Sequence, residues 1–156
     1  MAITQAMCTS FKAQVLLGTH NFHPSGSSAA DTFKIALYTA SATLLSAGTT
    51  AYITDGESAG ANYVAGGSAL TVNGVDTGTT SGFVDFGNIT FNNVTINADG
   101  ALIYNNTPST SDNAGSTLTN AAVCVLDFGG TKQATSGDFS IIFPGATSAA
   151  AIIRIA

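Results

Sequence analysis

Ala-Ala-Val-Cys-Val-Leu-Asp-Phe, at residues 121–128, is the longest run of apolar, β-prone residues in the sequence. In an extended chain, alternate side chains point to opposite faces. Both faces of this run are apolar, because Asp127 is its one charged residue. A strand with two apolar faces is typical of the interior of a β-fold. We therefore expect the chain to be arranged around this strand, and we expect Gly129 and Gly130 to end it.

Other elements are predicted from hydrophobic periodicity. Strands are expected at 32–39, 83–86, 138–143 and 151–155. One helix is expected at 4–17, with Thr4 as its N-cap and Gly18 just beyond its end. Within this helix Met7, Phe11 and Val15 recur at i, i+4 and i+8, so they form one apolar stripe.

Two dipeptides have the composition of tight hairpin turns. Asn73-Gly74 predicts one such turn. Asp99-Gly100 predicts a second turn with stronger support. A turn at these residues would pair the flanking strands so that their apolar side chains share one face. Residues 105–120 are polar with a single apolar anchor and are expected to form a projecting loop, either for contact or as a tolerated insertion.

These elements predict an all-β chain, namely a single β-sandwich or jelly-roll-like domain with a short N-terminal helix. The expected domain covers 1–156, with a helical arm at 1–18, a β-sandwich at 32–156 and the polar loop at 105–120. A domain of this length buries about 70% of the surface of its unfolded chain. It therefore needs no disulfide or metal ion to remain folded.

Charged residues make up 8% of the chain, against about 25% in an average protein. The surface must consist largely of hydroxyl, amide and glycine groups, which are cheaper to desolvate than charges. This composition favours a homo-oligomer, such as a dimer or trimer, or a permanent assembly.

The net charge is −5, and the four cationic side chains are Lys12, Lys34, Lys132 and Arg154. Nucleic acid binding requires clustered cations, so neither nucleic acid nor an anionic membrane surface is an expected partner. The N-terminus has no basic segment followed by an apolar one, so we expect no secretory leader. No apolar run approaches the roughly 20 residues of a membrane span.

The candidates for chemistry are few. Cys8 and Cys124 form either a disulfide or, the interpretation we favour, two small buried hydrophobic side chains. His20 and His23 have no further ligand nearby to complete a metal site. Asp55 and Glu57 offer at most a weak cation site, which an oligomer would have to complete. We therefore expect no enzyme, no metal and no cofactor.

Several blocks of the sequence resemble a family of small structural proteins of tailed bacteriophages. These blocks are residues 1–12, 33–39, 100–105, 122–130 and 152–156, and they follow one another along nearly the whole chain. The resemblance implies a virion component, and specifically a capsid decoration (cement) protein. The blocks contain no functional motif, so no site residue carries over. The chain departs from the family in its long loop at 105–120, so no shared contact is inferred there.

The expected function is therefore a non-enzymatic protein that binds the outside of the capsid and stabilises the shell. Its partners would be the major capsid protein and further copies of itself, on the surface of a virion assembled in the host cytoplasm. Met7, Phe11 and Val15 are the candidate capsid contacts, unless this stripe closes the protein's own core. The alternatives are a tail or fibre component that contacts the host surface, a non-viral self-assembling β-protein, and an enzyme.

Overall fold

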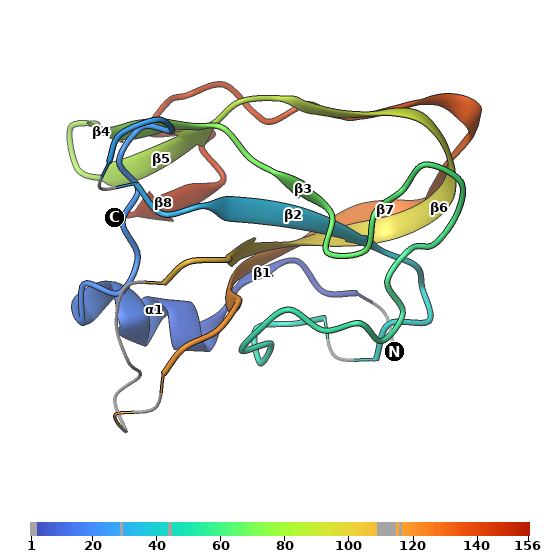
Figure 1. The fold of residues 1–156 in the computed structure, drawn as a ribbon. Helices are drawn as coiled ribbons and strands as arrows, with labels where there is room; N and C mark the ends of the chain where they lie inside the picture. Colours follow the sequence, from blue (N-terminus) through green and yellow to red (C-terminus); the bar gives the residue numbers. More distant parts are fainter. Residues whose placement is uncertain (1–2, 29, 44, 109–114, 116) are drawn as a thin grey trace.

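The structure, a computed structural model, describes residues 3–28, 30–43, 45–108, 115 and 117–156 (Figure 1). Its elements are β1 (Ala6–Met7), α1 (Thr9–Leu16), β2 (Phe33–Tyr38), β3 (Ser68–Ala69), β4 (Val72–Thr77), β5 (Gly82–Phe86), β6 (Ile89–Asn105), β7 (Ala121–Ile141) and β8 (Ile153–Ile155). Regular structure in the described residues is mostly strand, with one short helix, so the all-β prediction is confirmed. No helix in the described part of the chain is long and apolar enough to cross a membrane.

The strands form two antiparallel sheets. The larger has the order β1-β7-β6-β2-β3, and the smaller has the order β4-β5-β8. The apolar run at 121–126 is fully buried and belongs to β7, which lies between β1 and β6. The prediction that this run forms an interior strand is therefore confirmed. The finer description as a sandwich or jelly roll stays a prediction.

A long hairpin of β6 and β7 dominates the larger sheet. Its pairing extends from Asn105 opposite Ala121 to Ile89 opposite Ile141. Figure 1 shows both strands curving at the right of the view, so that their distal halves return above β2 and β3. Several register shifts occur along the pairing, and such bulges increase the local bend of a strand pair.

The strand β7 does not end at Gly129 and Gly130, contrary to the prediction. Both glycines have positive φ angles, +67° and +124°, and the strand continues through them to Ile141. Positive φ is accessible to glycine at little steric cost. The two glycines therefore provide a bulge within the curved strand. The strand predicted at 138–143 is not a separate element, because residues 138–141 are the end of β7.

Both predicted hairpin turns are also wrong. Asp99 and Gly100 lie inside β6, where Gly100 pairs with Tyr38 on one side and Asp127 on the other. A Cβ atom at Gly100 would lie 2.4 Å from the carbonyl oxygen of Leu126. Gly100 is therefore required for close backbone approach and not for a turn.

The second dipeptide, Asn73-Gly74, lies within β4, and the register shifts at this point. The turn of this hairpin comes later, where the Gly78 N–H donates to the Ser81 carbonyl at 2.7 Å. The strand predicted at 83–86 is confirmed as β5, and the one at 151–155 is shorter, as β8.

The helix is shorter than predicted. It begins after Cys8 in place of Thr4, while Gly18, with φ +69°, follows its end as predicted. Residues 4–7 are held against the larger sheet instead of continuing the helix. Thr4 N–H donates to Leu45 O at 3.0 Å, and β1 pairs with β7 through Met7 opposite Cys124. The N-terminal segment is thus docked on the body of the protein.

Candidate functional site

The three residues predicted as capsid contacts, Met7, Phe11 and Val15, line one groove but differ in exposure. Phe11 is only 1% exposed, and its ring packs 4.9 Å from the His20 ring and 6.0 Å from the Phe22 ring. Met7 and Val15 are partly buried against the same core. Phe11 therefore packs into the protein's own core, which is the alternative that the sequence left open for this stripe.

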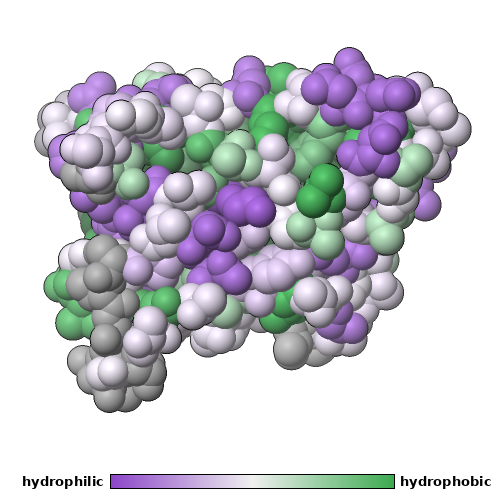
Figure 2. All heavy atoms as spheres, in the orientation of Figure 1, coloured by the Kyte–Doolittle hydropathy of each residue, from purple (hydrophilic) through white to green (hydrophobic). Residues whose placement is uncertain are grey.

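Met7, Phe11 and Val15 line a groove between α1 and β8, which we call the α1–β8 groove. Two strongly exposed aliphatic side chains border it, namely Leu16 at 89% and Ile155 at 56%. Lys12 and Arg154 also line it. Figure 2 shows an apolar patch at the lower left of the molecule, over the C-terminal end of α1. Two of the four cationic side chains of the protein thus lie beside an apolar hollow.

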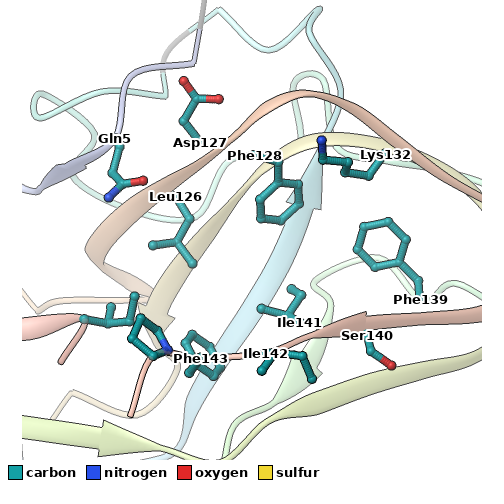
Figure 3. Close-up of a pocket in the computed structure, with 12 residues that line it drawn as sticks. Gln5, Leu126, Asp127, Phe128, Lys132, Phe139, Ser140, Ile141, Ile142 and Phe143 are labelled. Atoms are coloured by element: carbon teal, nitrogen blue, oxygen red, sulfur yellow. The ribbon is translucent and has the colours of Figure 1, made fainter. Parts of the chain in front are cut away.

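A second groove is formed by β7 itself and the segment that follows, and we call it the β7 groove (Figure 3). Its volume is about 310 Å³. Its lining is mainly apolar: Leu126, Phe128, Phe139, Ile141, Ile142, Phe143, Pro144 and Ile152, with Gln5, Asp127, Lys132 and Ser140 as the polar residues. Ile142 is 70% exposed, so its side chain is free for contact with a partner.

The curvature of β7 creates this groove. Phe128 comes from the first half of the strand and Phe139 from the second, and their ring centroids are 6.2 Å apart. In Figure 3 the Asp127 side chain points away from the groove while Leu126 points into it. Sequence reasoning missed this surface because it ended the strand at Gly129. The bulge that bends the strand has the same local composition as a turn.

His20 is part of a buried polar network. Its Nε2 lies 2.8 Å from Gln14 Oε1, and Asn105 Nδ2 lies 3.1 Å from its Nδ1. Asn105 also donates to Asp31 Oδ2 at 2.6 Å. Desolvation lowers the pKa of His20 to about 4, although nearby Asp31 raises it in part. The neutral ring connects α1, the following loop and the end of β6.

Glu57 is the centre of a second polar network. Its carboxylate accepts hydrogen bonds from Tyr52 Oη at 2.5 Å, Tyr63 Oη at 2.9 Å and the Gly66 backbone N–H at 2.7 Å. Tyr104 Oη donates to the Gly66 carbonyl at 2.7 Å. Burial is the main cause of the raised pKa of Tyr104, about 12, and the negative charge of Glu57 adds to it. The network fastens the irregular segment around Gly66 to β6.

These two networks connect distant segments of the fold through hydrogen bonds. Glu57 is occupied by its three donors, and Asp55 instead accepts from the Thr43 hydroxyl at 2.7 Å. His20 is engaged with Gln14, and His23 lies in the exposed part of the same loop. Among the described residues, no group of three His, Cys, Asp or Glu side chains is arranged to bind a metal ion.

Cys8 and Cys124 are free and buried. Desolvation raises the pKa of the Cys8 thiol to about 11, and the charge of Lys12 opposes this only in part. Burial likewise raises the pKa of Cys124. A thiol with a raised pKa is a poor nucleophile at neutral pH. The structure therefore agrees with the favoured interpretation of two small buried side chains.

The α1–β8 groove and the β7 groove offer apolar surfaces for binding. Both grooves combine exposed aliphatic side chains with a mainly apolar lining. Comparison with protein-family models, with curated proteins and with solved structures gave no match.

Proposed function

We propose that this chain is a non-enzymatic virion protein of a tailed bacteriophage that binds the outside of the capsid and stabilises the shell. The observation that carries the proposal is the largely uncharged surface with exposed aliphatic side chains, in a chain whose sequence blocks resemble phage structural proteins. The major capsid protein is the proposed partner, and the capsid surface is the proposed location.

The physical demands of this role agree with the composition. A decoration protein must remain attached to the shell while the surrounding ionic strength changes. A contact made by apolar and hydroxyl groups has little Coulomb attraction for salt to screen. Its stability comes mainly from the apolar area removed from water, at about 25 cal/mol per Å². The low charge content of this chain therefore favours a contact that persists in high salt.

The β7 groove is the surface that we propose for capsid contact. Its floor contains Phe128 and Phe139, and aromatic side chains are enriched where protein interfaces are fully buried. Ile142 lies on its rim and exposes 70% of its side chain. An aliphatic residue of the capsid subunit that enters the groove would cover both the floor and the rim.

Adding purified protein back to capsids that lack it tests this assignment. We expect the unmodified chain to sediment with the capsids and to raise their thermal disruption temperature. Ile142→Asp should reduce binding at least tenfold, because it places a charge in an apolar contact. Val64→Asp is the matched control, because Val64 is 73% exposed and lies outside the groove.

Two results would contradict the assignment. Equal binding by Ile142→Asp and the unmodified chain would exclude the β7 groove as the contact surface. A failure of the unmodified chain to bind capsids at all would exclude the decoration role.

A further inference from the structure

We infer that copies of this chain assemble head to tail, with the β8 edge of one copy paired to the β4 edge of the next. The inference rests on the smaller sheet alone and is independent of capsid binding. In the described part of the chain β4 and β8 each pair only with β5, so each has one open edge. An open edge presents unpaired N–H and C=O groups that can pair with another strand.

β4 leaves an edge of six residues open, and the distal part of β7, which β1 pairs only at Cys124 and Val125, leaves a longer one. The edge strands of the larger sheet, β1 and β3, have two residues each, and β8 has three, whereas β4 has six. The first three residues of β4 are covered within the chain, since Pro24 also lies beside Gly74. Val72 N–H donates to Ser25 Oγ, and Ser25 N–H donates to Val72 O, both at 2.8 Å. Residues 75–77 have no comparable cover from another described strand.

The hydrogen-bond pattern shows which backbone groups face outward from β4. The Gly78 N–H donates to Ser81 O in the turn, so these two residues form a hydrogen-bonded pair. Bonded and non-bonded pairs alternate along an antiparallel ladder. The N–H and C=O groups of Val75 and Thr77 therefore point away from β5, toward the open edge.

The same alternation continues across β5 to β8. Asp76 pairs with Phe83 as a hydrogen-bonded pair, so the backbone groups of Phe83 point toward β4. Phe83 is also opposite Arg154. The N–H and C=O groups of Arg154 must then point away from β5. Each edge thus offers complementary backbone groups at a defined position.

These groups match in a parallel register. Both β4 and β8 are antiparallel to β5, so they run in the same direction. Rotation about an axis along the strands preserves that direction and brings β8 beside the β4 of the next copy. In a parallel pair one residue bonds to both neighbours of the residue opposite. Arg154 N–H would donate to Val75 O, and Arg154 would lie opposite Asp76. Thr77 N–H, which donates to Asp76 Oδ1 at 2.7 Å in the single chain, would exchange that bond for one to Arg154 O.

The side chains are complementary in the same register. Arg154 and Asp76 carry opposite charges on one face of the sheet. In the single chain Arg154 Nη1 donates to the carbonyl oxygens of Ser148 and Ala149, at 2.9 and 3.2 Å. On the other face Val75, which is 62% exposed, would lie beside Ile153 of the next copy and close to its Ile155. Ile155 borders the α1–β8 groove, so the contact would cover apolar side chains that are open in the single chain.

A head-to-tail contact uses two different surfaces, so repetition of it closes a ring when the rotation permits. We therefore expect a discrete oligomer of the full-length chain in size-exclusion chromatography with light scattering. Val75→Asp and Ile155→Asp should each give monomers, because each introduces a carboxylate into the contact. Val64→Asp is the matched control, because Val64 is 73% exposed and lies in the segment before β3. This variant should leave the oligomer unchanged.

Mixing the two monomeric variants is the most selective part of the test. Val75→Asp retains an intact β8 edge and Ile155→Asp retains an intact β4 edge. The mixture should therefore give heterodimers, joined by one native contact, that grow no further. An oligomer built from two identical surfaces would not be restored in this way.

An exchange of the two charged residues tests the same contact without changing an apolar residue. Circular dichroism checks that each variant is folded. Asp76→Lys should weaken assembly, and Asp76→Lys combined with Arg154→Glu should restore it. A monomeric unmodified chain would overturn the inference and would leave the two edges to a different partner. Assembly that survives both Val75→Asp and Ile155→Asp would also overturn it.

Discussion

His20 shows how a single half-buried side chain can make the fold sensitive to pH. Gln14 Oε1 accepts hydrogen bonds but cannot donate them, so the proton of the neutral ring lies on Nε2. Nδ1 then accepts the hydrogen bond from Asn105. In a protonated ring, the Nδ1–H of His20 would face the Nδ2–H of Asn105, so two donors would point at each other. The folded state therefore favours the neutral ring, in agreement with the lowered pKa of about 4.

We predict that His20 makes the protein less stable as the pH falls below about 6.5. The pKa of His20 is lower in the folded state than in the unfolded state, so the unfolded state binds the proton first and is favoured by acid. The loss between about pH 7 and about pH 5 should be on the order of 1–2 kcal/mol, reduced from the full linkage value because the ring is partly exposed. Urea denaturation across this range measures it. His20→Gln should flatten the pH dependence, and an unchanged slope in that variant would assign the effect to other groups.

The second prediction for a single residue concerns the contribution of Glu57 to stability. Its carboxylate is surrounded by donors, and a glutamine in its place would turn an N–H group toward one of them. We expect Glu57→Gln to reduce the free energy of unfolding by about 2 kcal/mol, since hydrogen bonds to charged groups contribute about 1.5–3 kcal/mol.

Asp55→Asn is the control for that substitution, because Asp55 is exposed and its bonds to Thr43 lie at the surface. It should change the unfolding free energy by less than about 1 kcal/mol. Urea denaturation of both variants measures the difference. Equal effects would show that the tyrosine network around Glu57 does not fasten this segment.

At the scale of elements, the sequence predicted strands better than it predicted the connections between them. The strand expected at 32–39 is β2, and the apolar run at 121–128 is the start of β7, buried from 121 to 126. Both strands could be recognised because a buried strand needs mostly apolar side chains. That pattern can be seen within one short segment of the sequence. The same holds for the C-terminal end of the helix, where Gly18 takes a positive φ.

The errors have one common physical cause. Glycine after Asp, Asn or another glycine is found in tight turns, but it is also found where a strand bulges or another backbone approaches closely. Gly100 and Gly129 are of this second kind. The difference depends on partners distant in the sequence, such as Leu126 for Gly100. The β7 groove could not be predicted for the same reason, because it exists only when the strand continues past Gly129.

A substitution at Gly100 distinguishes these two roles. Asparagine is accepted in left-handed turn positions, so a hairpin turn at Gly100 would tolerate Gly100→Asn. In this structure the new Cβ would collide with the Leu126 backbone, and overpacking of this kind costs about 1–3 kcal/mol. We expect a loss near the upper end of that range in urea denaturation.

Gly129→Asn is the matched control, because Gly129 has φ +67° and open space around it. We expect it to cost about 1 kcal/mol or less, since asparagine adopts this conformation more readily than most residues. A tolerated Gly100→Asn would contradict the continuous β6 strand.

At the scale of the whole molecule, the small number of charges determines how the protein can associate. With 8% charged residues, long-range electrostatic attraction contributes little to any contact. We predict that binding to capsids changes less than threefold between low and high salt, measured by cosedimentation. Release of the protein at high salt would indicate a charge-dependent contact, for which the grooves offer few ionic groups.

The amount of this protein in purified virions tests the capsid-decoration proposal most directly. Quantitative mass spectrometry of whole particles gives its molar ratio to the major capsid protein. We predict a ratio near one, or a simple fraction of it, because a decoration protein occupies equivalent positions over the whole shell. A ratio of a few hundredths would contradict the proposal and favour a tail or fibre component. Absence from the particles would exclude a virion role.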